Sequence, residues 1–146
     1  MTGIRRFRAS LGVVLMAGVI MAGGVLGVGT ASAKMTPKLL VKPATGLKNH
    51  EMVTISGTGF KPGDTVFLVE CLRKATGQAG CNTPAPMPPL VTISSTGVLR
   101  ATKFRVVTGK VGNGTCGTKK VNLSRCDLSA GNALGADSAT YPIVFK

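Results

Sequence analysis

Residues 52–71 read MVTISGTGFKPGDTVFLVEC, and this segment predicts two β-strands joined by a tight turn. In residues 52–58 valine and isoleucine alternate with threonine and serine, and this period of two is typical of a half-buried strand. Residues 61–64, Lys-Pro-Gly-Asp, have the composition of a turn. Residues 65–71 are almost continuously apolar, which favours a central strand.

The rest of the chain after residue 34 also consists of short segments of strand composition, separated by turn residues. None of these segments shows sustained helical periodicity. The pattern therefore predicts an all-β fold, a seven-stranded immunoglobulin-like antiparallel sandwich, with a small closed barrel as the alternative. Residues 109–117 are rich in glycine and are expected to form a loop. Pro142 cannot donate a hydrogen bond within a sheet, so its strand is expected to lie at an edge or to begin there. The further strands that we expect are 38–41, 90–94, 98–107, 121–123 and 141–145.

The N-terminus has the organisation of an export signal. Three arginines in residues 1–10 precede the apolar run 11–28, and Ala31-Ser32-Ala33 supplies small residues for signal peptidase. Residues 1–33 are therefore predicted to be a signal peptide that is cleaved after Ala33. An uncleaved membrane anchor is the alternative, because the apolar run approaches spanning length. The expected mature protein is secreted, has no membrane span and consists of one domain, 34–146.

This mature domain is strongly basic. The chain has 18 Lys and Arg against five Asp and Glu, and loss of the three N-terminal arginines leaves 15 basic residues and a net charge of +10. Such a charge attracts anionic partners, for example DNA or an anionic polymer of the cell envelope. The basic residues are dispersed and include no run of five, so the sequence shows no dedicated nucleic-acid arm.

The four cysteines form two pairs, each with a spacing of ten positions. An even number of cysteines in an exported chain is typical of disulfides. Four cysteines allow three connectivities, and closure of short loops favours Cys71 with Cys81 and Cys116 with Cys126. A bridge between the sheets is the alternative, but in antibody domains it accompanies a buried tryptophan, which this chain lacks. The spacings do not match a zinc site, so no metal is expected.

Several short motifs occur in a characteristic order along the mature domain. Residues 41–47 read VKPATGL, and residues 53–60 read VTISGTGF and lead through a turn to the strand that ends at Cys71. Cys81-Asn82 follows, and residues 128–132 read LSAGN. In this order, and together with the signal peptide, the motifs resemble the neocarzinostatin family of secreted actinobacterial apoproteins over residues 38–145.

The resemblance implies a seven-stranded immunoglobulin-like sandwich with two short-loop disulfides. In that family a cleft at one end of the barrel holds an enediyne chromophore, which the protein shields and releases, and the chromophore then cuts DNA and kills cells. The chemistry belongs to the ligand. The resemblance therefore implies an antibiotic carrier that is not an enzyme, with a non-covalently bound small apolar natural product as its ligand. We expect the protein to be a monomer.

The chain departs from the family where aromatic side chains line that cleft. Arg73 stands where the family has a tryptophan, Pro86 stands where it has a phenylalanine, and residues 107–114 offer no matching phenylalanines. Fewer ring faces leave less area for a flat aromatic ligand, so a different apolar ligand is the alternative. Glu70 is either an acid that lines the cleft or a surface acid paired with Arg73. The residues that we expect to line the cleft are Val69, Glu70, Leu72, Arg73, Pro86, Met87, Phe104, Val107 and Ser129.

The sequence does not nominate any catalytic residue. The single histidine, His50, lies in a polar turn far in sequence from both cysteine pairs, and the five acidic residues are scattered. General acid–base or nucleophilic catalysis needs such groups to be paired. The second function that the sequence supports is that of a ligandless basic protein, retained at the envelope or extracellular matrix by binding to anionic polymers.

Overall fold

The computed structural model describes residues 35–83 and 87–146. This part of the chain contains ten β-strands and two short 3-10 turns. The turns are η1 (Gln78–Gly80) and η2 (Lys120–Asn122). The strands are β1 (Lys38–Lys42), β2 (Met52–Thr58), β3 (Thr65–Leu72), β4 (Cys81–Asn82), β5 (Leu90–Thr92), β6 (Leu99–Arg105), β7 (Gly109–Val111), β8 (Gly114–Cys116), β9 (Cys126–Gly131) and β10 (Ser138–Ile143).

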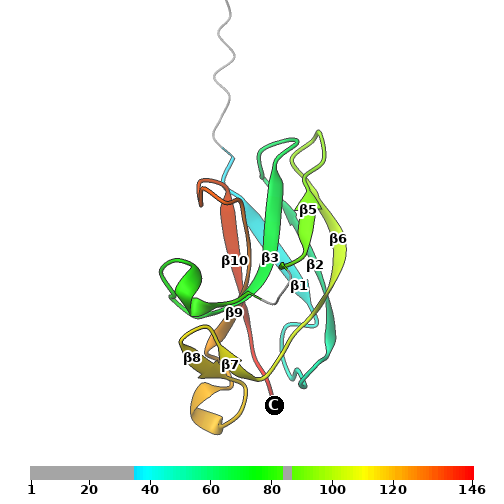
Figure 1. The fold of residues 1–146 in the computed structure, drawn as a ribbon. Helices are drawn as coiled ribbons and strands as arrows, with labels where there is room; N and C mark the ends of the chain where they lie inside the picture. The colour runs from blue at the N-terminus through cyan, green and yellow to red at the C-terminus, as the bar shows by residue number, and fades with distance from the viewer. Residues whose placement is uncertain (1–34, 84–86) are drawn as a thin grey trace, which may run out of the picture. The chain divides into compact units, whose positions relative to one another are not determined.

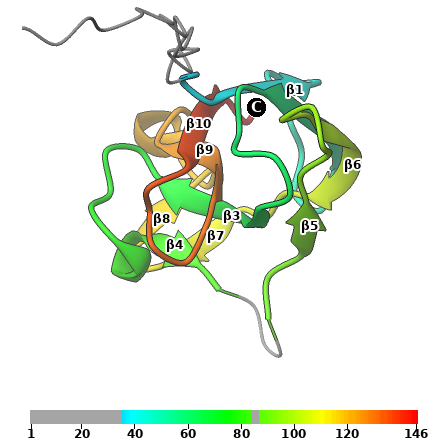
Figure 2. The same ribbon diagram turned by 90° about the horizontal axis from the view of Figure 1, so that it is seen from above.

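The strands form two facing layers and a separate hairpin. One layer is a three-stranded sheet in the order β1-β2-β6, and the other is a five-stranded sheet in the order β10-β9-β3-β4, in which β5 also pairs with β3. Strands β7 and β8 form the hairpin. Every pairing between these strands is antiparallel. Figures 1 and 2 show β1, β2 and β6 on one side of β3 and β9. The predicted all-β sandwich is confirmed.

The core lies between the two layers and follows from the period of two along the strands. In β1, β2 and β9, alternate residues are buried and the residues between them are more exposed. Apolar side chains from the inner faces of both sheets thereby remove their surface from water together, which is the main stabilising contribution to a sandwich. The largest apolar side chains that are fully buried are Phe60, Leu47, Ile55, Leu68, Ile93, Leu99, Leu128 and Ile143.

Two local predictions were wrong. Residues 109–117 are not a plain loop but contain the hairpin β7–β8, whose turn includes Gly112 at φ +52°. A Cβ on Gly112 would lie 2.4 Å from the carbonyl oxygen of Ala79, so glycine lets the hairpin pack against the β3–β4 connection. Residues 121–123 are not a strand, because Asn122 shapes a 3-10 turn there: its Oδ1 accepts hydrogen bonds from the backbone N–H groups of Thr118 and Lys119.

The edge position of Pro142 and both disulfides were predicted correctly. Strand β10, which contains Pro142, is the edge strand of the five-stranded sheet. The disulfides join Cys71 to Cys81 and Cys116 to Cys126. The predicted signal peptide, residues 1–33, lies outside the described residues. Within the described residues, no helix has the length and hydropathy needed to cross a membrane.

Candidate functional site

A cleft of about 830 Å³ lies over the outward face of the five-stranded sheet. Its floor comes from the side of β3 and β9 that faces away from the core. Phe67 and Val69 on β3 and Ser129 on β9 line it, and Val69 and Ser129 are direct partners in the sheet register. Because these residues alternate with the buried residues of the same strands, the strand period itself directs them into the cleft.

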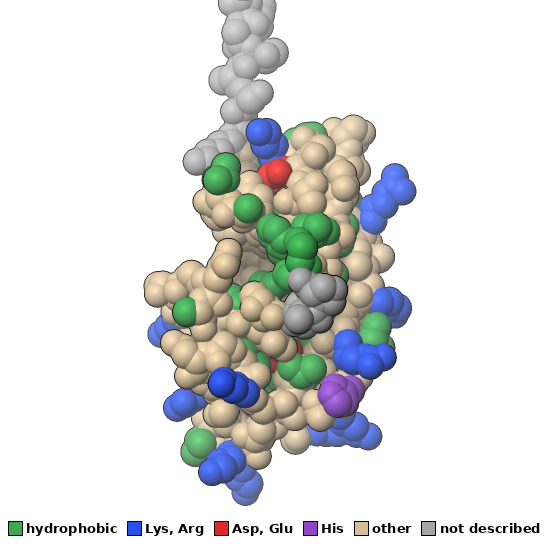
Figure 3. Space-filling view, in the orientation of Figure 1, with side chains coloured by type: hydrophobic (Ala, Val, Ile, Leu, Met, Phe, Trp, Pro, Cys, Tyr) green, Lys and Arg blue, Asp and Glu red, His purple; other side chains and the backbone are tan. Residues whose placement is uncertain are grey.

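Two connections form the walls of the cleft. One wall comes from Leu72 at the end of β3, Lys74 in the β3–β4 connection and the first disulfide, which joins β3 to β4. The β9–β10 connection supplies residues 132–135 of the other wall. Met87 and Leu134 are large apolar residues at the cleft, with exposed fractions of 58% and 89%. Figure 3 shows the surface hollowed on this face, with hydrophobic side chains gathered beside the hollow.

Asn132 fixes the wall formed by the β9–β10 connection. Its Nδ2 donates a hydrogen bond of 2.8 Å to Oδ2 of Asp64, and its Oδ1 accepts one of 3.2 Å from the N–H of Ala136. The nearby Asp137 carboxylate is buried and accepts a hydrogen bond from the N–H of Lys61. The hydrogen bond from Asn132 is also the main cause that lowers the pKa of Asp64. Asn132 and Asp137 therefore tie this wall to the β2–β3 turn.

The lining gives the cleft the character of a binding site rather than a catalytic one. Phe67 is the one aromatic ring among the described lining residues, and the other apolar contacts come from aliphatic side chains and the first disulfide. The hydroxyl of Ser129 and the amide of Asn132 offer hydrogen bonds. His50 does not line the cleft, and the cysteines that do are bonded to each other. A pocket of this size and composition suits an apolar molecule with a few polar groups.

The structure brings some of the predicted cleft residues together and separates others. Val69, Leu72, Met87 and Ser129 line the cleft, whereas Pro86 lies outside the described residues. The other four predicted residues, Glu70, Arg73, Phe104 and Val107, are not among its described lining residues.

Phe104 lies in β6 of the opposite layer, and Val107 follows the end of that strand. Phe104 pairs with the buried Val53 in the β2–β6 register, so it shares the inner face of the three-stranded sheet. The backbone N–H of Val107 donates a hydrogen bond of 2.9 Å to Oε2 of Glu70. Phe104 is half-buried and packs against the core, Val107 is half-buried, and neither is among the described residues that line this cleft.

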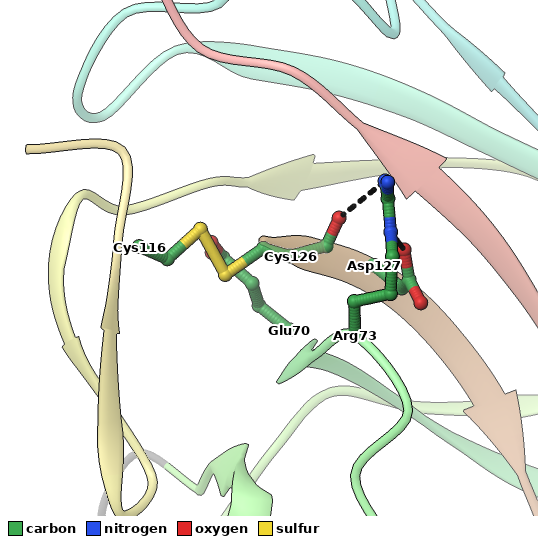
Figure 4. Close-up of polar contacts among 5 residues, drawn as sticks. All are labelled: Glu70, Arg73, Cys116, Cys126 and Asp127. Atoms are coloured by element: carbon green, nitrogen blue, oxygen red, sulfur yellow. Dashed lines mark hydrogen bonds and ion pairs between the residues drawn. A yellow bond between two sulfur atoms is a disulfide. The ribbon is translucent and has the colours of Figure 1, made fainter. Parts of the chain in front are cut away.

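Glu70 and Arg73 do not pair with each other. The side chain of Glu70 is 1% exposed and points to the core side of β3, where its Oε1 lies 4.0 Å from Sγ of Cys116. Burial raises the pKa of Glu70 to about 7. Arg73 instead forms an ion pair with Asp127 at 3.0 Å and donates a hydrogen bond to the carbonyl of Cys126. Figure 4 shows Glu70 beside the second disulfide and Arg73 beside Asp127.

The group of Glu70, Cys116 and Cys126 is compact enough to resemble a metal site, because its ligand atoms lie within 4.8 Å of one another. The two sulfur atoms are bonded to each other, however, and a metal would need them as thiolates. The group therefore offers a single carboxylate and is better described as a buried acid packed on a disulfide.

Sequence reasoning missed Phe67 and the wall at residues 133–135. A signal for Phe67 was present, since it stands two positions before Val69 and strand residues two apart share a face. Residues 133–135 gave no such signal, because their place at the cleft depends on the pairing of β9 with β10.

Comparison with known proteins places this domain among characterised relatives. The family model described as the Neocarzinostatin family matches residues 39–145. Macromomycin from Streptomyces macromomyceticus is 33% identical over 109 residues, which are 70% of this chain and 73% of that protein. The antitumor antibiotic C-1027 apoprotein from Streptomyces globisporus is 31% identical over 145 residues, which are 94% of each chain. The solved structure of macromomycin matches with a TM-score of 0.58 and 29% identity, over 76% of this chain and 100% of its own.

Proposed function

Because the chain belongs to the neocarzinostatin family, we propose that it is a secreted, monomeric carrier that holds a small apolar natural product non-covalently in the cleft. The chromoproteins of this family are non-enzymatic carriers, and the relatives of this chain are apoproteins that bind enediyne chromophores. Carriage, and not catalysis, is therefore the role that we assign to the cleft.

The observation that carries the proposal is the lining of the cleft. Its volume of about 830 Å³ accommodates a drug-sized molecule, and Val69, Leu72 and Met87 supply apolar contacts. Phe67 is the one ring among the described lining residues, so extensive stacking with a flat aromatic ligand is not built into it. We therefore propose a largely aliphatic or compact ligand that has a polar edge for Ser129 and Asn132.

Variants that fill the cleft or place a charge in it test this proposal. Ser129→Trp places a large ring on the floor, so binding of a neutral polycyclic dye such as Nile red is expected to weaken by about tenfold or more. Met87→Asp is expected to weaken it too, because it puts a charge beside the apolar lining. Dye fluorescence titrations measure both effects. Mass spectrometry of protein purified gently from its native culture medium is expected to find a co-purifying small molecule.

Ser56→Trp is the matched control. Ser56, like Ser129, is a half-buried residue in the middle of a strand, but it lies on the outward face of the three-stranded sheet. Dye affinity that is equal in wild type, Ser129→Trp and Ser56→Trp would show that the dye binds elsewhere and would remove the cleft as the carrier site.

A further inference from the structure

The outward face of the three-stranded sheet carries a group of basic side chains. Lys38 and Lys42 on β1 and Lys103 and Arg105 on β6 are all exposed. In the register, Lys42 and Lys103 both pair with Thr54 of the central strand, so these three residues form one row across the sheet. Residues two or four apart on one strand share a face, which places Lys38 and Arg105 on the same side. We call these four cations the basic face.

The basic face is not neutralised by acidic side chains. All outward positions of β1, β2 and β6 are described, and none of them is acidic. The Glu51 carboxylate, which precedes β2, accepts a hydrogen bond of 2.7 Å from the N–H of Lys48. Asp127 pairs with Arg73 in the one ion pair found among the described residues. Nζ of Lys103 donates a hydrogen bond to the neutral hydroxyl of Thr54, so its charge remains available.

The basic face and the cleft occupy opposite layers of the sandwich. The cleft lies over the outward face of the five-stranded sheet, and the basic face is the outward side of the other sheet. In Figure 2, β1 and β6 lie on the far side of β3 and β9 from β4. A partner on the basic face therefore leaves the cleft open. We propose that the basic face is a docking surface for a flexible phosphodiester polymer that carries no bases.

The spacing of the charges suits such a polymer. Neighbouring strands are about 4.8 Å apart and alternate residues on a strand about 7 Å apart. The register places Lys38 and Arg105 six residues apart along β2, so the four cations span an area of roughly 10 Å by 20 Å. A flexible chain with regularly repeated phosphates adapts to this spacing without a preformed groove. Leu40 and Met52, which are 43% and 44% exposed on the same face, offer apolar contact to the carbon backbone of the polymer.

The same face is poorly suited to nucleic acid. The major groove of duplex DNA admits a helix or a two-stranded ribbon, whereas this face is three strands wide. Single-stranded nucleic acid is held by aromatic side chains that stack on bases. The outward positions of β1, β2 and β6, all of them described, carry no aromatic residue, since Phe104 faces the core. The face therefore offers charge and apolar contact, but it has no aromatic side chain with which to stack on bases.

The test measures binding of the mature protein to poly(glycerol phosphate) by calorimetry across a range of salt concentrations. For wild type we expect the logarithm of affinity to fall with the logarithm of salt with a slope of about −3, which is roughly −0.7 for each of four phosphate contacts. The variant Lys38→Gln/Lys42→Gln/Lys103→Gln/Arg105→Gln is expected to lose at least tenfold in affinity at low salt and most of that slope.

The matched control removes an equal number of charges outside the basic face: Lys110→Gln/Lys119→Gln/Lys120→Gln/Arg125→Gln, at exposed positions in and beside the second disulfide loop. It is expected to keep affinity within about twofold of wild type. Equal losses in both variants would show that diffuse charge is responsible and would overturn the proposal. Tighter binding of duplex DNA, or of vesicles with anionic lipid, through the same four residues would overturn the assigned partner. Circular dichroism confirms that both variants are folded.

Discussion

Glu70 couples the stability of the domain to pH. Its pKa of about 7 lies above the ordinary value of 4.5 because burial disfavours the carboxylate. The folded state therefore binds this proton more tightly than the unfolded state does. The resulting contribution to the free energy of unfolding is fully present below pH 4.5 and is lost as the pH rises to about 7. We expect urea denaturation to show a loss on the order of 3 kcal/mol across this window.

The variant Glu70→Gln is expected to remove that pH dependence and to be more stable than wild type at pH 8. Its amide oxygen can still accept the hydrogen bond of 2.9 Å from Val107, and it carries no charge to bury. Glu51→Gln, which removes a charge from a surface turn, is the control and should not reproduce the effect. A Glu70→Gln curve that still falls between pH 4.5 and 7 would contradict this account.

The position of Glu70 also shows what the period of two could and could not predict. Val66 and Leu68 precede Glu70 at alternate positions of β3, and all three are buried on the core side. Strict alternation would have assigned Glu70 to the interior, but an isolated acid is usually expected in water. What stabilises it there, the N–H of Val107, is 37 residues away in sequence and could not be inferred locally.

At the level of elements, the strands with strong local alternation were predicted and those that depend on distant pairing were not. Residues 52–58 and 65–71 alternate or are continuously apolar, and they correspond to β2 and β3. Strand β9 was missed as a strand because Asp127, Ser129 and Gly131 have little strand preference. The same three residues line the cleft. Their small or polar side chains therefore both make the strand hard to predict and leave room for the cleft.

The two disulfides close loops of equal length but differ in burial. Each has a sequence separation of ten, for which chain entropy contributes roughly 2–3 kcal/mol. Both cysteines of the second bridge are fully buried, whereas Cys81 is half-buried. We expect Cys116→Ala/Cys126→Ala to cost more stability than Cys71→Ala/Cys81→Ala, because it also leaves a cavity in the core.

Guanidinium denaturation of the two double variants measures this difference. In Cys116→Ala/Cys126→Ala the carboxyl of Glu70 loses a packing neighbour, so the variant should be weakened most at pH values where Glu70 is ionised. Equal stabilities of the two variants at pH 5 and at pH 8 would show that loop closure alone accounts for both bridges.

For the whole molecule, the net positive charge itself affects the free energy of unfolding. The predicted mature domain, residues 34–146, has a net charge of +10, and Arg73–Asp127 is the one ion pair among its described residues. Like charges held close together in the folded state repel more than in the expanded unfolded chain. The Debye length is about 30 Å at 0.01 M salt and about 8 Å at 0.15 M, so added salt screens this repulsion. The melting temperature is therefore expected to rise by a few degrees between these concentrations, for about 1 kcal/mol gained.

Differential scanning calorimetry in sodium chloride measures this rise, with sucrose at equal osmolality to separate screening from solute exclusion. The four-fold glutamine variants of the basic face and of the second disulfide loop should both show a smaller rise, because self-repulsion depends on total charge. Polymer binding, in contrast, depends on which four charges are removed. A melting temperature that salt leaves unchanged or lowers would show that long-range repulsion does not destabilise the folded state. Favourable interactions of individual charges with their neighbours would then have to balance the net charge.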